Sequence, residues 1–365
     1  MKTSLFNFEL PESLIATEPA NPRDAARMLV ISDAFEDKLI ADLPSFLRPG
    51  DVVVFNDTRV IPARLFGKRG EAGVEILLHK NLTSPSPLVG EGGERGYLWQ
   101  CFARPSKKIK SGDRVFFAEN FHAEVIRKLP GGEVLLQFNC TGSVMRAHLE
   151  RHGHMPLPPY IEKKRYADES DKSRYQTVYA KHEGSVAAPT AGLHFTDKLL
   201  SAIDAAGATR AHVTLHVGGG TFLPVKTEDT DDHIMHSEFA TITPETADLI
   251  NREKANGGRV IAVGTTSLRT LESAVDEGGT LNAFSSETDI FITPGYRFKI
   301  VDMLLTNFHL PRSTLFMLVS AFCGLEKMQA AYAHAITSNY RFYSYGDACL
   351  LYRQDQGTTE AVSFA

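Results

Sequence analysis

Short polar motifs lie in the second half of this 365-residue chain, each close to the end of an apolar run. They combine histidine, glycine, threonine and arginine, which can transfer protons, admit a ligand closely or bind an anion. Because ligands bind at strand ends in open α/β sheets, the pattern predicts a pocket built from several strand ends. The motifs are APTAGLHFT (188–196), HVGGGTF (216–222), GTTSLR (264–269), TNFHLPRST (306–314) and YRFYSYGD (340–347).

The HVGGGTF motif has three consecutive glycines, Gly218 to Gly220, after an apolar strand-like run. Glycine lets the backbone approach a ligand without an intervening side chain. We interpret the segment as a loop around a nucleoside, and a tight turn without a ligand explains it equally well. It is not a P-loop, because no Gly-Lys-Ser/Thr follows.

The GTTSLR motif joins a strand ending at Gly264 to a helix expected to open at Thr266 or Ser267. Free N–H groups and the helix dipole at such a start favour a carboxylate or phosphate by about 0.3–1 kcal/mol. Arg269 could add a bidentate contact to the same anion. Ordinary helix capping by Thr266 or Ser267 is the alternative.

Three histidines, His194, His216 and His309, lie inside these motifs, which suits proton transfer near neutral pH. A structural role in the core is equally consistent with each of them. Other histidines have spacings found among metal ligands, but no carboxylate follows at zincin spacing, so no metal is expected. They are His148, His152, His154, His233 and His236.

Two stretches are locally basic: residues 100–128 carry a net charge of +4 and residues 151–182 a net charge of +3. Tyrosines are interleaved with the charges in the second stretch. Single-stranded RNA suits this combination, because cations follow the phosphates and rings stack on bases. A solvated surface with structural tyrosines is the alternative.

The elements that position these motifs follow two patterns. Short strand-like runs separated by Gly, Pro or Asn predict a small β-barrel at residues 65–150, with a flexible low-complexity loop at 84–96 whose deletion should leave function intact. Strands expected at 51–55, 259–264, 289–294 and 302–308 alternate with helices. We therefore predict an α/β domain, 1–64 plus 151–365, with a mixed, largely parallel sheet.

Composition narrows the class of protein. Hydrophobic residues make up 43% and charged residues 23%, and the net charge is −5, which excludes wholesale disorder and a uniformly basic surface. The four cysteines are far apart, so no disulfide framework or cysteine-based zinc site is expected. Without a signal-peptide pattern or a run of 18 apolar residues, we expect a cytoplasmic protein that has no membrane partner.

The motifs also resemble, in order and spacing, the S-adenosylmethionine:tRNA ribosyltransferase-isomerase family of queuosine biosynthesis. The resemblance runs from about Phe6 to Leu351, interrupted mainly by 84–96. Besides the motifs above, it rests on RDAARMLV, DVVVFNDTRVIPARLFG, RYQTVYAK, HIMHSE, TDIFITPGY and the longer run LLTNFHLPRSTLFMLVSAF.

The resemblance implies a reaction. The ribosyl part of S-adenosylmethionine passes to 7-aminomethyl-7-deazaguanine at the tRNA wobble position and is isomerised to give epoxyqueuosine, while adenine and methionine leave. S-adenosylmethionine is then a ribosyl donor, and no metal or other cofactor is expected. The sulfonium acidifies the C5′–H, so a base must remove that proton, and a positioned base or acid typically supplies 10²–10⁴-fold, about 3–5 kcal/mol.

The motifs supply the site residues that this chemistry requires. The methionine carboxylate is expected to bind at the helix start and Arg269, and the methionine ammonium at Glu238 or Glu272. The chain is expected to be a monomer. We expect proton transfer by His194, His216, His309, Glu238 and Asp347, without identifying the base. Expected S-adenosylmethionine contacts are Thr190, Gly192, Gly218, Gly219, Gly220, Thr221, Thr265, Thr266, Ser267 and Arg269. Expected tRNA contacts are Lys107, Lys108, Lys110, Tyr160, Tyr175 and Tyr179.

Two rival functions are a tRNA-binding protein without catalysis and a methyltransferase that uses S-adenosylmethionine. Two ligand-type strand ends argue against a simple binder. No Gly-x-Gly-x-Gly loop follows a first strand, which argues against a methyltransferase. Release of adenine rather than S-adenosylhomocysteine would distinguish a ribosyltransferase-isomerase from a methyltransferase.

Overall fold

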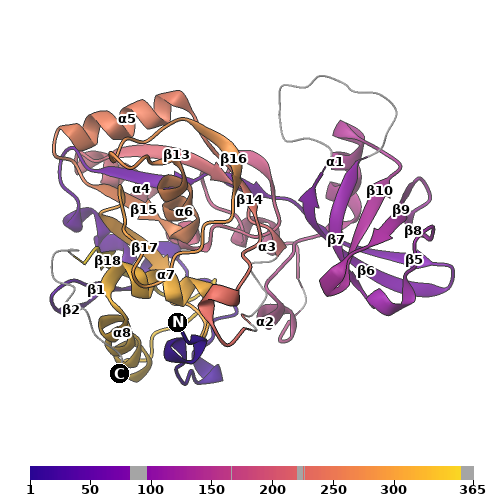
Figure 1. The fold of residues 1–365 in the computed structure, drawn as a ribbon, viewed down its shortest axis with the longest axis horizontal. Coiled ribbons are helices and arrows are strands. Elements are labelled where there is room, and N and C mark those ends of the chain that lie inside the picture. The colour runs from indigo at the N-terminus through magenta and orange to yellow at the C-terminus, as the bar shows by residue number, and fades with distance from the viewer. Residues whose placement is uncertain (83–96, 166, 220–224, 226, 355–365) are drawn as a thin grey trace.

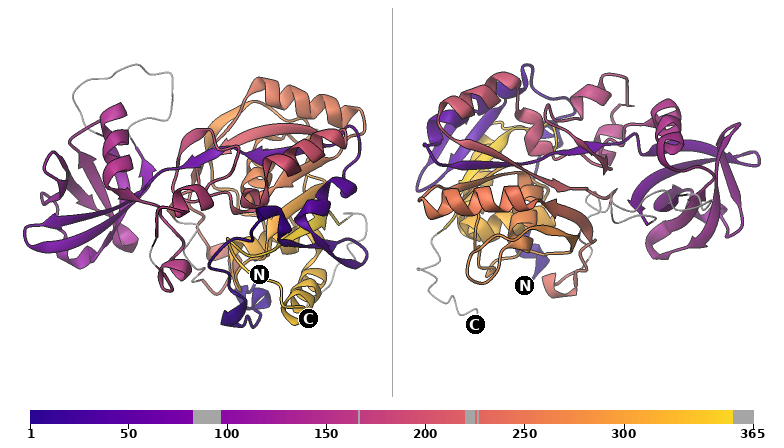
Figure 2. Two further views of the ribbon diagram at one scale, coloured as in Figure 1. Left: turned by 180° about the vertical axis from the view of Figure 1, so that it is seen from behind. Right: turned by 90° about the horizontal axis from the view of Figure 1, so that it is seen from above.

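The computed structural model describes residues 1–82, 97–165, 167–219, 225 and 227–354. They form a nine-stranded sheet with helices on both faces and, beside it, a small closed barrel (Figure 1). The two further views in Figure 2 show the barrel at one end of an elongated molecule. The expected fold class, α/β with a mixed sheet and a small β-barrel, is confirmed.

The large sheet is parallel at its centre. Strand β3 lies between β13 and β15, β15 also pairs with β17, and all three pairings are parallel, as is β18 with β1. The remaining neighbours pair antiparallel. In spatial order the strands are β16 (Phe284–Thr288), β14 (Glu238–Ile242), β13 (Thr209–Leu215), β3 (Val52–Asn56), β15 (Val260–Val263), β17 (Met303–Asn307), β18 (Ala348–Tyr352), β1 (Arg27–Ile31) and β2 (Phe35–Leu39).

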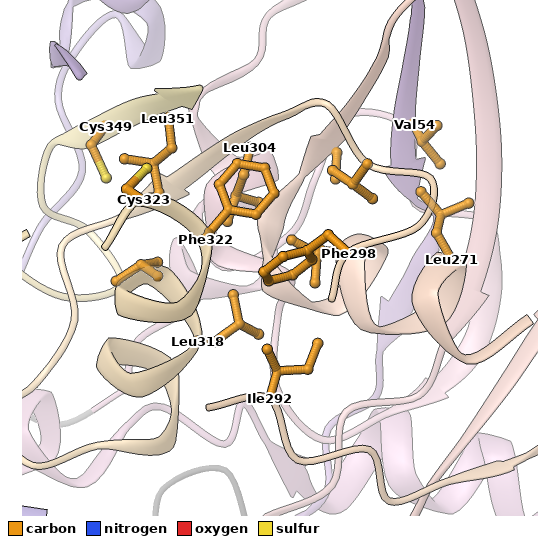
Figure 3. Packing of buried hydrophobic residues seen from close by; sticks show 14 of the residues in the cluster. Val54, Leu271, Ile292, Phe298, Leu304, Leu318, Phe322, Cys323, Cys349 and Leu351 are labelled. Atoms are coloured by element: carbon orange, nitrogen blue, oxygen red, sulfur yellow. The ribbon is translucent and has the colours of Figure 1, made fainter. Parts of the chain in front are cut away.

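Both faces of the central strands are buried, as parallel sheets require. Val52 and Val54 of β3 belong to one core cluster, and Val53 and Phe55 belong to the cluster on the other face. Figure 3 shows the first cluster, where Val54 packs in the same core as Leu304 from the neighbouring part of the sheet. This alternation explains why the strands are continuous apolar runs.

Helices cover the sheet and begin at side-chain caps where the sequence supplies them. Thr196, Thr243 and Ser313 each accept a backbone N–H in the first turn of the helix that follows. Among the described residues, no helix combines the length and apolar character needed to cross a bilayer. The helices of this region are α4 (Asp197–Ala205), α5 (Pro244–Ala255), α6 (Gly264–Ala274), α7 (Thr314–Cys323) and α8 (Leu325–Thr337).

The barrel closes through a pairing between its first strand, β5, and β8. At the closure a Cβ on Gly67 would lie 2.7 Å from the Phe117 ring, so only glycine fits. Helix α1 (Gly142–His152) packs on the barrel through Met145 and Leu149. The strands are β5 (Arg64–Arg69), β6 (Ala72–Asn81), β7 (Leu98–Arg104), β10 (Glu133–Phe138), β9 (Phe121–Lys128) and β8 (Arg114–Ala118), with β11 (Gly153–His154) beside β5.

Short elements connect the barrel to the large sheet. Strands β4 and β12 pair in parallel, and helices α2 and α3 follow the barrel in the chain. Their bounds are β4 (Thr58–Val60), β12 (His182–Ser185), α2 (Pro159–Glu162) and α3 (Asp171–Arg174). The strand expected at 289–294 is wrong: that segment has no regular structure, and the edge strand β16 precedes it.

Candidate active site

Two cavities lie where the motifs meet. The first, of about 560 Å³, is at the ends of β15 and β17, and we call it the strand-end cavity. The second, of about 570 Å³, is lined by both barrel and α/β residues, and we call it the interdomain cavity. Both lie within the usual range for small-molecule sites. The predicted site residues are therefore divided between two neighbouring hollows.

Helix α6 presents its N-terminus to the strand-end cavity through Gly264, Thr265 and Thr266. The helix begins at Gly264, and no side chain caps it, so the predicted start at Thr266 or Ser267 is wrong. The hydroxyl of Thr266 is buried and has no hydrogen-bond partner among the described residues, whereas that of Ser267 donates to the Val263 carbonyl at 2.8 Å. The Thr266 hydroxyl is thus available to a ligand, whereas the Ser267 hydroxyl is not.

His309 lines the strand-end cavity. Its Nε2 lies 3.1 Å from the hydroxyl of Thr306, and its backbone N–H donates to the Tyr332 hydroxyl at 2.9 Å. Burial lowers the pKa of His309 from 6.5 to about 3. The ring is therefore neutral at neutral pH and can accept a hydrogen bond, while burial makes it a weaker base than a free imidazole.

His194 lies behind the same cavity wall and does not line the cavity. Its Nε2 is 3.1 Å from Nδ2 of Asn307, whose Oδ1 accepts a hydrogen bond from the Thr190 hydroxyl at 2.9 Å. Burial lowers the pKa of His194 to about 4, partly offset by Asp347. Asn307 and Thr190 do line the cavity, so His194 acts on it through Asn307.

His216 and Glu238 line the interdomain cavity. Nδ1 of His216 lies 2.8 Å from the Thr58 hydroxyl, and burial lowers its pKa to about 4. Oε2 of Glu238 accepts a hydrogen bond from Nη1 of Arg269 at 2.5 Å, and both side chains are buried. Because Arg269 is paired with Glu238 and does not line the strand-end cavity, it is not placed beside Thr266 as predicted.

Gly192, Gly218 and Gly219 accommodate protein side chains. A Cβ on Gly218 would lie 2.9 Å from the His79 ring, and the N–H of Gly219 donates to Nδ1 of His79 at 2.9 Å. A Cβ on Gly192 would lie 2.0 Å from the Tyr179 hydroxyl. These glycines thus admit His79 of the barrel and Tyr179. Gly218 also lines the interdomain cavity, so its expected contact with the nucleoside stays a prediction, whereas Gly192 and Gly219 line neither cavity. The predicted Gly220 and Thr221 lie outside the described residues.

The carboxylates of Asp347 and Glu272 accept hydrogen bonds from backbone N–H groups, which gives both residues a structural role. Asp347 accepts the N–H groups of Arg27 and Arg341, at 3.1 and 2.8 Å, and lines neither cavity. Glu272 accepts three backbone N–H groups from residues 299–301. Neither carboxylate lines either of the two cavities, so the expectation of a direct role for them finds no geometric support there.

The predicted tRNA contacts also separate. Lys107, Lys108 and Lys110 are exposed at one end of the barrel. Tyr160 lines the strand-end cavity, and its hydroxyl accepts the N–H of Ser344 at 2.9 Å. Tyr175 lines the same cavity, but it has no exposed surface with which to stack on a base in this conformation. The ring of Tyr179 packs against Phe55 at 4.8 Å between centroids.

One group of three side chains among the described residues could offer metal ligands, namely His79, Glu133 and His236, whose ligand atoms lie within 4.8 Å of one another. Nδ1 of His79 already accepts the Gly219 N–H, so the neutral ring carries its proton on Nε2 and has no lone pair left for a metal. The group of three therefore does not fit a metal. Among the histidines with metal-like spacing, the His148 ring stacks on the Phe121 ring, with 4.5 Å between their centroids.

Sequence reasoning missed His79 and the role of Asn307. Asn307 stands inside the TNFHLPRST motif, so its polar side chain at a strand end was a usable signal. His79 lies on barrel strand β6, far from every motif. Its importance becomes visible through long-range contacts, such as the hydrogen bond from the Gly219 N–H.

The sequence is similar to those of known proteins along nearly its whole length. A family model described as "Queuosine biosynthesis protein" matches residues 3–351. A Mesorhizobium japonicum protein named S-adenosylmethionine:tRNA ribosyltransferase-isomerase is 57% identical over 369 residues, covering 97% of this chain and 99% of that protein. A Rhodospirillum rubrum protein of the same name is 56% identical over 352 residues, covering 96% of this chain and 98% of that protein.

A solved structure is also similar. The crystal structure of the Thermotoga maritima S-adenosylmethionine tRNA ribosyltransferase is 33% identical, covers 95% of this chain and 99% of its own, and has a TM-score of 0.53. The matches span the barrel, both cavities and every motif quoted above. The chain therefore belongs to the queuosine biosynthesis protein family, as the motifs predicted.

Proposed function

We propose that this chain is an S-adenosylmethionine:tRNA ribosyltransferase-isomerase that acts in tRNA queuosine modification. The observation that carries the proposal is 57% identity, over nearly the whole chain, to a protein of that name. The tRNA substrate carries 7-aminomethyl-7-deazaguanine at its wobble position, and the products are epoxyqueuosine-tRNA, adenine and methionine. The enzyme works as a monomer in the cytoplasm, without a metal, another cofactor or a membrane partner.

S-adenosylmethionine occupies the strand-end cavity in this proposal. The uncapped N-terminus of α6 and the free hydroxyl of Thr266 receive the methionine carboxylate. Lys163, Lys164 and Arg312 also line the cavity and make its rim positive, although Lys164 lies 3.5 Å from Glu12. These groups replace Arg269, whose charge is already balanced by Glu238.

His309 is the base in this proposal, because it is the histidine that lines the cavity beside the α6 N-terminus. It removes the C5′ proton that the sulfonium acidifies, adenine departs from C1′, and the aminomethyl nitrogen bonds to C1′. The bond between C1′ and the ring oxygen then breaks, the C5′ carbanion bonds to C1′ to close the five-membered carbocycle, and the freed oxygen displaces methionine from C5′ to form the epoxide. His194 has a positioning role, since it holds Asn307 at the cavity wall.

For tRNA, the proposal uses the exposed lysines of the barrel. Replacing Lys107, Lys108 and Lys110 by alanine should weaken binding and flatten its salt dependence by about 0.7 per lost phosphate contact. An unchanged slope of binding against salt would exclude this end of the barrel from the RNA interface.

The activity itself is tested by incubating the protein with S-adenosylmethionine and tRNA bearing the aminomethyl base. Free adenine and free methionine in equal amounts are expected. Formation of S-adenosylhomocysteine would indicate methyl transfer and would exclude the proposal.

A further inference from the structure

We propose that the outer face of the barrel carries a base-stacking platform for the tRNA, an aromatic ridge made of His154, Phe66, Phe116 and His122. The inference rests on the proposed function, because it assigns part of the surface for the same RNA substrate. It adds a contact made by rings, which is distinct from the lysine contacts at the barrel end.

The ridge crosses four neighbouring strands, β11, β5, β8 and β9. The Phe66 and His154 rings lie 5.2 Å apart, and the Phe116 and His122 rings lie 5.3 Å apart. Phe116 of β8 stands opposite His122 on the neighbouring strand β9 and opposite Lys68 on the other neighbouring strand, β5. Since Lys68 lies two residues after Phe66 on the same face of β5, the two ring pairs are diagonal neighbours.

The two phenylalanines are exposed although the barrel has its own core. Their neighbours Leu65 and Val115 point inward and are fully buried, so the strand alternation directs Phe66 and Phe116 outward. Phe66 is 55% exposed and Phe116 is 47% exposed. Large aromatic side chains gathered on one exposed face are typical of an interaction site.

Charge on the same face favours RNA as the occupant. Lys68 and Arg114 lie on the exposed side of β5 and β8, and within the described part of the chain neither forms an ion pair. Carboxylates also lie on this face: Glu124 stands opposite Arg114, and Glu75 stands opposite Phe66 and pairs with Arg64. Exposed rings beside unpaired cations suit nucleic acid, since bases stack on the rings while phosphates meet the cations.

An ion pair links one end of the ridge face to the helix that leads into the proposed catalytic cavity. Arg64, on the ridge face of β5, forms ion pairs with Glu75 and with Glu162, both at 2.7 Å. Glu162 ends helix α2, and the next residues, Lys163 and Lys164, line the strand-end cavity. An RNA loop with one base directed to the cavity could therefore place neighbouring bases on the ridge.

The test replaces Phe66 and Phe116 by alanine, singly and together, and measures binding of an anticodon stem–loop RNA that carries the aminomethyl base. Because these side chains are exposed, the variants should fold, which circular dichroism verifies. Each replacement should weaken RNA binding about tenfold, and the KM for S-adenosylmethionine should not change. The slope of binding against salt should also stay constant, since stacking releases no counterions.

Ile126→Ala is the matched control, because Ile126 is 40% exposed on β9 and has no ring to stack. It should bind the RNA as the wild type does. Unchanged RNA binding by the Phe66/Phe116 double variant would overturn the proposal that the ridge binds RNA. If the wild type formed a dimer and the double variant were a monomer with unchanged RNA affinity, the ridge would be a contact between two copies of the chain, which would also overturn the proposal. Failure of the wild type to release adenine would instead count against the proposed function, because RNA binding is measured without the reaction.

Discussion

Replacing Glu238 by glutamine should destabilise the α/β domain strongly. Glu238 and Arg269 are only 6% and 7% exposed, and their closest atoms lie 2.5 Å apart. Glutamine can still accept the Gly218 N–H, which now donates to Glu238 at 3.0 Å. The substitution therefore removes the charge and retains most of the shape and this hydrogen bond.

The expected cost follows from leaving the Arg269 guanidinium buried without a counterion. Removing one partner of a buried ion pair costs about 3–5 kcal/mol. Nε of Arg269 keeps a 3.3 Å contact with the Ile290 carbonyl, which cannot balance a full charge. By contrast, Glu277→Gln breaks a pair with Lys299 in which Glu277 is 93% exposed, so it should cost less than about 1 kcal/mol.

Urea denaturation followed by circular dichroism gives the free energies of unfolding. The double variant Glu238→Gln/Arg269→Met removes both charges, and it should be about 2 kcal/mol more stable than Glu238→Gln alone. A cost under about 1 kcal/mol would refute the reasoning, because it would mean that the Arg269 guanidinium does not depend on Glu238 as its counterion.

Two further predictions concern packing and pH. Gly192→Ala should destabilise the protein by about 1–3 kcal/mol, because the new Cβ would overlap the Tyr179 hydroxyl. The control Gly73→Ala should not destabilise it, because no atom lies within 4 Å of the Cβ added there. Thermal unfolding of the two variants tests the difference. Burial lowers the pKa of His309 from 6.5 to about 3. As the pH falls below 6.5, the unfolded chain therefore binds a proton on this ring before the folded protein does, and the free energy of unfolding decreases. His309→Gln should reduce the slope of unfolding free energy against pH by up to about 1.4 kcal/mol per unit between pH 6 and 4, and an unchanged slope would contradict the burial argument.

Much of the sheet could be predicted because its central strands are continuous apolar runs with clear ends. The runs at 51–55, 259–264 and 302–308 correspond to β3, β15 and β17. The segment 289–294 failed because it is equally apolar: Ile292 is buried in the core, but the segment pairs with no strand. Its neighbour β16 was missed because FSSET is a mostly exposed edge strand without an apolar pattern.

The sequence predicted the position of a site residue where a single local motif determines it. The prediction failed where the position depends on a contact with a side chain far away in the sequence. Thr266 and His309 reach one cavity because their motifs follow adjacent strands, β15 and β17. The partner of Gly219 is His79, 140 residues away, and the partner of Arg269 is Glu238, 31 residues away. No local pattern reveals such pairs, so glycines and an arginine that pack against protein resemble ligand contacts in the sequence.

The central claim is that the sugar of S-adenosylmethionine passes to tRNA from the strand-end cavity. The most direct measurement supplies S-adenosylmethionine labelled with carbon-13 throughout the ribose, digests the tRNA and analyses its nucleosides by mass spectrometry. We expect the whole ribose label in the modified wobble nucleoside with the wild type, and its loss with the folded His309→Gln variant. Label that stays out of the tRNA, or transfer that continues undiminished in His309→Gln, would contradict the account.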